Sequence, residues 1–308
     1  MFADVDPVTG NLTAETIAKT ITPKTKAVIV VHLFGRPAKM DSICKLLSER
    51  GIALIEDCAQ AHYAEYKGQK VGTFGDFGCF SLQSSKQITC GDGGMTLVNT
   101  EKYSERASLF ADKGFDRKRS LSTILFLAPN YWMTELQAAV GRCQLRRLPG
   151  LIRSRQQSAE QLRQALQDIP QIILPEDTDA KNAWWRFTFG VDERAIGVST
   201  MDFVEALKVE GVKTSKEFPA RPLFAHDLIS KQQTYGTSRF PFSKVFYEQP
   251  MLDNFPGFKE FAGRMIPIGW SSQVKPRHVD SIDAAIRKVV QALVSSRSKS
   301  SAAVPVAG

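Results

Sequence analysis

The sequence predicts an α/β fold built on a mainly parallel sheet, and three observations lead to this class. The run Lys-Ala-Val-Ile-Val-Val-His-Leu at 26–33 is continuous and rich in β-branched residues, which is typical of a strand buried on both faces. Residues 40–50 carry apolar side chains at helical spacing and end at Gly51. A second short apolar run follows at 52–55, so the order strand, helix, strand indicates an α/β unit.

The alternation continues toward the middle of the chain. Further predicted elements are strands at 78–82 and 95–98 and a helix at 103–112. Thr134 followed three residues later by Gln137 is a capping-box pattern, and it predicts the start of a long helix. We expect Pro149 to interrupt this helix, with a second amphipathic piece ending near residue 167.

The pattern of the chain changes after Pro170. The predicted elements are an aromatic strand at 184–189, a helix that opens with Ser199 and Asp202 and stops at Gly211, a long ordered loop at 218–267 and a last amphipathic helix from Val279 to Leu293. We therefore predict a larger domain over 1–148, a connecting helix and smaller domain over 149–294, and a disordered tail over 295–308.

Composition excludes several classes of protein. The 308 residues are 43% apolar and 23% charged, and no run of 18 apolar residues spans a bilayer, which excludes a wholly disordered or membrane-spanning chain. The net charge of +8 is dispersed, so no nucleic-acid partner is expected. Five separated cysteines without a C-x-x-C pair predict free thiols in the cytoplasm, and four unclustered histidines predict no metal site.

Two polar residues follow neighbouring apolar runs of the predicted sheet. Asp57 comes after the run at 52–55, and Lys86 comes after the strand at 78–82. Ligands of open α/β sheets bind at the carboxyl ends of the strands, so these side chains are the first candidates for a site. A lysine that forms a Schiff base and an aspartate that pairs with the ring nitrogen are what a pyridoxal phosphate enzyme needs.

Each candidate also has an ordinary structural explanation. Asp57 alone is compatible with a helix cap, and Lys86 alone with a surface lysine. The glycines at 91–94 do not form a dinucleotide-binding or P-loop motif. The pair Trp184 and Trp185 is predicted to be core rather than a stacking platform for a cofactor. His32 and His62 are predicted to be packing or hydrogen-bonded loop residues rather than acid–base groups, and Cys58 and Cys90 are predicted to be inert.

Five ordered strings resemble the DegT/StrS family of pyridoxal-phosphate-dependent sugar aminotransferases. They are VHLFGRPA at 31–38, EDCAQAH at 56–62, VGTFGD at 71–76, FSLQSSK at 80–86 with GDGG at 91–94, and NYWMTELQ at 130–137. The resemblance extends to about Leu293. It implies fold type I, with a mainly parallel sheet domain flanked by helices and a smaller C-terminal α+β domain.

The resemblance assigns roles to five residues. It implies that Lys86 binds the cofactor covalently and moves the proton, and that Asp57 pairs with the pyridine nitrogen. Gln60 matches a position beside the ring, and Ser81 a hydroxyl that binds the phosphate. Asn130 matches a residue that reaches the phosphate of the neighbouring subunit, which implies a homodimer with composite sites. The implied reaction moves an amino group from an amino acid, with glutamate or glutamine expected, to a keto sugar, sugar nucleotide or cyclitol.

The sequence departs from the family pattern in two places. The segment at 1–7 resembles an internal segment of other members, so about 100 residues of the family pattern are not represented before it. Trp132 stands where the family commonly has arginine. Two alternatives therefore stay open, a catalytically inactive remnant or scaffold subunit, and a related enzyme that dehydrates its substrate. Substrate contacts are expected in 218–270, with Arg221, His226 and Tyr235 as candidates.

Overall fold

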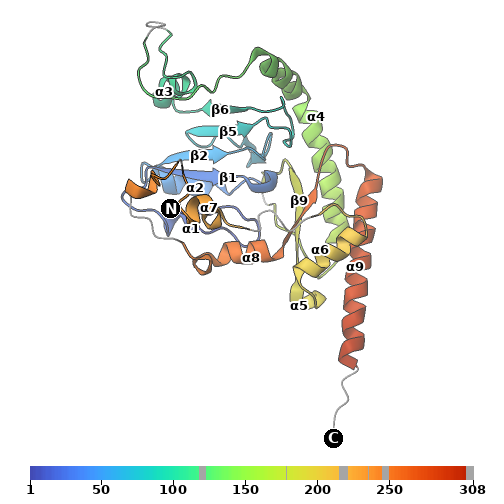
Figure 1. The fold of residues 1–308 in the computed structure, drawn as a ribbon. Coiled ribbons are helices and arrows are strands. Elements are labelled where there is room, and N and C mark those ends of the chain that lie inside the picture. Colours follow the sequence, from blue (N-terminus) through green and yellow to red (C-terminus); the bar gives the residue numbers. More distant parts are fainter. Residues whose placement is uncertain (118–122, 178, 215–220, 235, 245–249, 303–308) are drawn as a thin grey trace. The chain divides into compact units, whose positions relative to one another are not determined.

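The computed structural model describes residues 1–117, 123–177, 179–214, 221–234, 236–244 and 250–302 (Figure 1). The chain forms two compact units. The first, here called the sheet unit, consists of Thr22–Gln156 and Asp177–Trp185, and the second consists of Met1–Ile21, Gln157–Glu176 and Arg186–Gly308. The units interleave along the chain, whereas the predicted domains at 1–148 and 149–294 are contiguous. That division into domains stays a prediction.

A four-stranded sheet forms the centre of the sheet unit. Its strands, in spatial order, are β1 (Ala27–Val31), β2 (Ala53–Asp57), β5 (Phe77–Ser81) and β6 (Gly94–Val98). The first three run parallel and β6 is antiparallel to β5. The predicted mainly parallel sheet is therefore confirmed, and the carboxyl ends of β1, β2 and β5 lie at one edge of it.

The prediction that β1 is buried on both faces is wrong. Val30 is fully buried, but Ile29 is 58% exposed and Val31 is 36% exposed. Among the described residues β1 pairs with β2 alone, so it is an outer strand of the sheet. Its β-branched run indicates a strand, but it does not by itself distinguish a central strand from an edge strand, because β-propensity depends on packing context.

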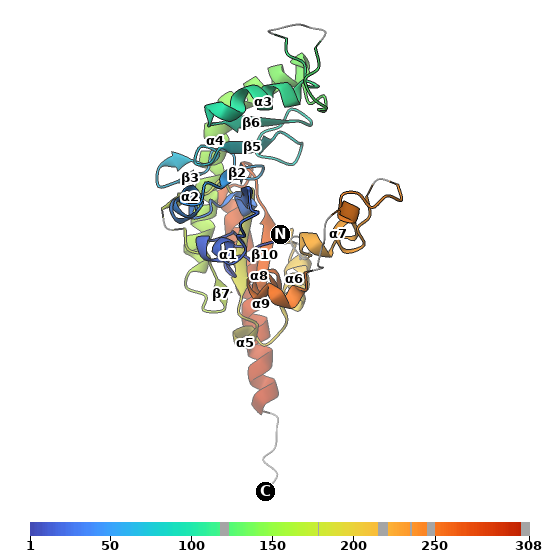
Figure 2. The ribbon, with the colours of Figure 1, turned by 90° about the vertical axis from the view of Figure 1, so that its left-hand side faces the viewer.

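Helices and short strands complete the sheet unit. They are η1 (Leu33–Gly35), α2 (Met40–Ser48), α3 (Glu101–Ala111), the first part of α4 (Glu135–Leu166) and a small sheet of β3 (Glu65–Tyr66), β4 (Gln69–Lys70) and β8 (Ala180–Lys181). The capping box at the start of α4 is confirmed, because the Gln137 N–H donates to Thr134 Oγ1 and the Thr134 N–H donates to Gln137 Oε1. Helix α3 lies beside β6 in both views (Figures 1 and 2).

Pro149 does not interrupt α4, contrary to the prediction. The helix runs without a break from Glu135 to Leu166, with Pro149 inside it. A proline removes one backbone donor from a helix. On either side of it the buried side chains of Leu148 and Ile152 pack into the core of the sheet unit, and this burial offsets the missing hydrogen bond.

The second unit contains a three-stranded antiparallel sheet with helices. The strands, in spatial order, are β10 (Met265–Gly269), β9 (Arg186–Val191) and β7 (Ile172–Ile173). The helices are α1 (Ala14–Ala18), α5 (Glu193–Ile196), α6 (Thr200–Val209), α7 (Asp227–Ser230), α8 (Pro256–Arg264), α9 (Pro276–Ala302) and the single turns η2 (Leu223–Ala225), η3 (Phe242–Lys244) and η4 (Leu252–Asn254). The predicted cap of α6 is confirmed, because Ser199 Oγ accepts the Asp202 N–H.

The long loop predicted at 218–267 is partly wrong, since it contains α8 and most of β10. Pro256 occupies the first position of α8, where a missing N–H leaves no intrahelical bond unmade. The parts of this prediction at 218–220, 235 and 245–249 lie outside the described residues. Helix α9 covers the start of the predicted tail up to Ala302, and 303–308 lie outside the described residues. In the described ranges, no helix combines the length and apolarity needed to cross a bilayer.

Candidate functional site

The carboxyl ends of β2 and β5 bring the first candidate residues together. Asp57 is the last residue of β2 and pairs in register with Cys79 of β5, two residues before Ser81 ends that strand. The connection from β5 to β6 then carries Lys86, whose backbone N–H donates to the Gln83 carbonyl at 3.1 Å. Lys86 therefore lies on the turn that follows β5, the strand that pairs with β2 beside Asp57.

The amine of Lys86 is partly desolvated, and it also interacts electrostatically with the negative charge of Asp57. Burial lowers the pKa of Lys86 below its ordinary value, and the negative charge of Asp57 acts in the opposite direction without cancelling the effect. Asp57 Oδ1 also accepts the Ala59 N–H at 3.0 Å, which fixes the direction of its side chain. The carboxylate therefore forms a local turn, not the helix cap that its position alone allowed, and it also has an electrostatic effect on the lysine.

Gln60 and Ser81 hold the loops around these two residues. Gln60 Oε1 accepts the Phe34 N–H at 2.7 Å, and the Gln60 carbonyl accepts a hydrogen bond from the Gln87 side chain. Ser81 Oγ accepts the Gln83 N–H at 3.3 Å. These bonds tie the segment after β1, the segment after β2 and the lysine turn into one framework.

The remaining predicted residues belong to other parts of the chain. Asn130 is exposed on the segment before α4 and forms an isolated bridge with Asp112, and no contact described above joins it to Lys86. Arg221 and His226 belong to the second unit, where Arg221 lies 3.8 Å from Asp227. Tyr235 lies outside the described residues.

Glu56 is a structural centre of the site that sequence reasoning did not single out. The carboxylate is fully buried and accepts the N–H groups of Gly72, Phe74 and Gly75 at 2.7 to 2.8 Å, with His32 Nε2 at 3.1 Å. Burial alone would raise the pKa of Glu56, but the hydrogen bonds outweigh burial and hold this pKa below its ordinary value. Glu56 thereby fastens the segment before β5 to β2, next to Asp57.

His32, Glu56 and Cys58 form a cluster of metal-ligand type, with ligand atoms within 4.8 Å of one another. His32 Nδ1 accepts the Ala38 N–H at 3.1 Å, so Nε2 carries the proton and donates it to Glu56. Both ring nitrogens are therefore engaged. Burial raises the pKa of the Cys58 thiol, which keeps it protonated. His32 and Glu56 therefore form a hydrogen-bonded pair, with the protonated Cys58 thiol beside them.

His62 is buried beside the lysine turn and is held neutral. Its Nδ1 lies 3.0 Å from Gln87 Oε1, and burial, with a smaller contribution from the charge of Lys86, lowers its pKa from 6.5 to about 4. The unfolded chain therefore binds one more proton than the folded chain between these two values. The stability that this difference provides is complete above pH 6.5 and is lost as the pH falls toward 4.

We expect the free energy of unfolding to decrease by about 3 kcal/mol between pH 6.5 and pH 4 because of His62. His62→Gln removes this dependence, which urea unfolding followed at several pH values would measure. His226→Gln, at an exposed position, is the matched control and should leave the slope unchanged. An unchanged slope in His62→Gln would contradict the assignment.

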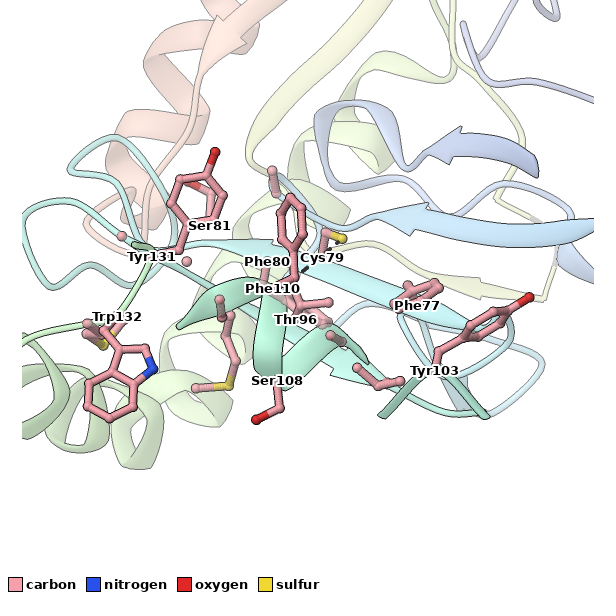
Figure 3. Close-up of a pocket in the computed structure, with 18 of the residues that line it drawn as sticks. Phe77, Cys79, Phe80, Ser81, Thr96, Tyr103, Ser108, Phe110, Tyr131 and Trp132 are labelled. Carbon is pink, nitrogen blue, oxygen red and sulfur yellow. Dashed lines mark hydrogen bonds between the residues drawn. The ribbon is translucent and has the colours of Figure 1, made fainter. Parts of the chain in front are cut away.

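A cavity of about 1210 Å³ opens over β5, β6 and α3 and reaches the framework at Ala59 and Ser81 (Figure 3). Its lining is largely apolar, and Trp132 and Tyr103 lie at opposite ends with Phe110 and Thr96 between them. Of the predicted site residues that the structure describes, Ser81 alone lines it. Neither Asp57 nor Lys86 lines the cavity, so the ends of β2 and β5 remain the better candidate for chemistry.

Two named relatives are similar to this chain in sequence over most of its length. The spore coat polysaccharide biosynthesis protein SpsC of Bacillus subtilis is 32% identical over 272 residues, which are 84% of this chain and 69% of SpsC. The GDP-perosamine synthase of Vibrio cholerae is 30% identical over 262 residues, 83% of this chain and 69% of that protein. The chain thus spans somewhat more than two thirds of each relative.

Solved structures show the same fold. An aminotransferase from Psychrobacter cryohalolentis superposes with a TM-score of 0.82 at 26% identity, over 95% of this chain and 75% of that one. The structure of DesI, solved in the presence of its TDP-sugar product, gives a TM-score of 0.75 at 26% identity, over 98% of this chain and 71% of that one. The fold is therefore that of pyridoxal-phosphate-dependent transferases of fold type I, as predicted. A family model described as DegT/DnrJ/EryC1/StrS aminotransferase matches residues 1–260, and the chain belongs to this family of sugar aminotransferases.

Proposed function

We propose that this chain is a pyridoxal-phosphate-dependent aminotransferase that moves an amino group from an amino acid, glutamate or glutamine, to a keto sugar, sugar nucleotide or cyclitol. The observation that carries the proposal is the placement of Asp57 and Lys86 on segments that leave neighbouring parallel strands at one edge of the sheet. The membership of a sugar aminotransferase family supports the substrate class.

The donor set fits the proposed cofactor. A carboxylate complements a protonated pyridine nitrogen, an amine with a lowered pKa reacts with an aldehyde, and a hydroxyl at a strand end complements a phosphate. Asp57, Lys86 and Ser81 supply these three groups. Gln60 would lie beside the ring, and Asn130 would reach the site of a second copy in a homodimer.

The residues of the chain have distinct tasks in this reaction. When bound, pyridoxal phosphate supplies the electron sink for the carbon that loses its proton. Lys86 Nζ takes that proton and later returns it, and its lowered pKa keeps a larger share of the amine in the neutral form that can accept a proton. Asp57 would pair with the ring nitrogen, and the hydrogen bond from the Ala59 N–H holds its carboxylate in position.

We expect Lys86→Ala to lose the visible absorption band that the full chain develops with pyridoxal phosphate, and to lose transamination by at least about a hundredfold. Absorption titration, followed by borohydride reduction and peptide mapping, measures the band and its attachment site. Lys45→Ala, at an exposed position of α2, is the matched control and should behave as the wild type. The same band in Lys86→Ala would refute the assignment, and a chain that binds no cofactor would favour the inactive remnant.

A further inference from the structure

The indole of Trp185 contacts the lysine turn in two ways, although the two segments are separated by 100 residues. Its Nε1–H donates to the Ser85 carbonyl at 2.8 Å. Its ring lies under the amine of Lys86, with Nζ 4.9 Å from the ring centroid. One contact therefore fixes the backbone next to the lysine, and the other faces the amine itself.

The indole of Trp185 is held in place by contacts with Phe34. The ring of Phe34 stacks on it at 6.3 Å with an interplanar angle of 12°, and the Trp185 N–H donates to the Phe34 carbonyl at 2.9 Å. Phe34 in turn donates its own N–H to Gln60 Oε1. The orientation of Trp185 is thus set by the same framework that surrounds the carboxyl end of β2.

The backbone on both sides of this stack is closely packed. Gly35 has φ +90, and a Cβ there would lie 2.8 Å from the Gln60 carbonyl oxygen and 2.9 Å from the nitrogens of Trp184 and Trp185. Trp184 is buried with a left-handed φ of +47, and its carbonyl accepts a hydrogen bond from Arg155 at 2.8 Å. Only a residue without a side chain fits at 35, so the segment that carries Trp185 has little freedom to move.

The contact with the ring depends on the charge of Lys86. The face of an indole attracts an ammonium group and has no comparable attraction for a neutral amine. Asp57 attracts the same ammonium from the end of β2. Loss of the proton weakens both attractions together, which releases the amine at the moment when it becomes a nucleophile.

We propose that Trp185 is a positioning residue for Lys86, which holds the protonated amine through its ring face and the lysine turn through Ser85. The inference rests on the proposed role of Lys86 but concerns the chain without its cofactor. It also corrects the sequence-based expectation for this pair, because Trp184 is core, as expected, whereas Trp185 is half-exposed and contacts the candidate nucleophile.

Carbon NMR of the reductively methylated, cofactor-free full chain tests this position directly. We expect the N-methyl signal of Lys86, identified by its absence in Lys86→Ala, to be shifted upfield by the indole ring and to lose this shift as the pH rises through the pKa of the amine. Trp185→Leu should abolish the upfield shift. Trp132→Leu, which changes an exposed tryptophan of the same unit, should leave it unchanged.

A second, more conservative variant keeps the test valid if Trp185→Leu fails to fold. Trp185→Phe keeps an aromatic face and removes the bond to Ser85, so we expect it to retain a reduced upfield shift. An upfield shift that persists in Trp185→Leu, or that is absent in the wild type, would overturn the proposal. The band of Lys86→Ala tests the proposed function separately, because the NMR measurement contains no cofactor.

Discussion

Glu56→Gln is expected to destabilise the sheet unit by about 3 to 5 kcal/mol. The carboxylate accepts four hydrogen bonds, two at each oxygen, from Gly72 and His32 on one side and from Phe74 and Gly75 on the other. An amide offers one oxygen and one NH2 group, so one pair of donors would face another donor in a fully buried place. The loss is large because these donors have no access to water.

Urea unfolding followed by tryptophan fluorescence measures this loss. Glu49→Gln, at an exposed position after α2, is the matched control and should change the free energy of unfolding by less than about 0.5 kcal/mol. The lowered pKa of Glu56 adds a second signature. Its stabilising contribution is complete above its ordinary pKa of 4.5 and is lost as the pH falls through the lower folded value, a dependence that Glu56→Gln should lack. Equal losses in the two variants would contradict this account.

Gly78→Ala is expected to cost about 3 kcal/mol or more. A Cβ at this position would lie 2.3 Å from the Gly72 carbonyl oxygen and 2.5 Å from the Gly72 Cα, and both are backbone atoms. Gly72 cannot withdraw, because its N–H is bonded to Glu56 and its carbonyl accepts a bond from Asn99. The methyl group must therefore displace β5 or break the bonds of Glu56.

The thermal midpoint of unfolding and the borohydride-trapped yield at Lys86 are the measurements for this variant. Gly150→Ala makes the same change on an exposed turn of α4, where the nearest neighbour is 4.0 Å away, and should stabilise the chain by about 0.5 to 1 kcal/mol. Gly78→Ala with wild-type stability would show that Gly72 yields, and would remove the basis of the prediction.

Local pattern was enough to predict the elements that begin and end with clear signals. The apolar run of β2, the capping box at Thr134 and the cap at Ser199 each depend on residues within a few positions of one another. The same reasoning fails at Pro149 and at 256–267, because it treats each proline as a break. In the structure, packing of neighbouring side chains outweighs the missing donor at Pro149, and Pro256 starts a helix.

The candidate site was predictable in part for a related reason. Asp57 and Lys86 follow apolar strands, so topology alone places them at one edge of the sheet. Glu56 acts through contacts with residues 16 to 24 positions away along the chain. Trp185 acts through a contact with a residue 100 positions away. No spacing rule within one segment reveals such contacts. The sequence offers one signal for Glu56, which is an acid inside a strand whose apolar residues predict burial. An unpaired buried charge is too costly to persist, so such an acid must have partners.

The open sides of the four-stranded sheet have a consequence for self-association. Among the described residues, β1 and β6 each pair with one neighbour, so each leaves a row of backbone donors and acceptors unmatched on its outer side. Ile29 and Met95, both more than half exposed, add apolar surface to these two strands. Such rows act as templates for strands of other chains. If this chain aggregates, β1 and β6 are where strands of other chains would pair, and a lysine or proline introduced there would act as a gatekeeper.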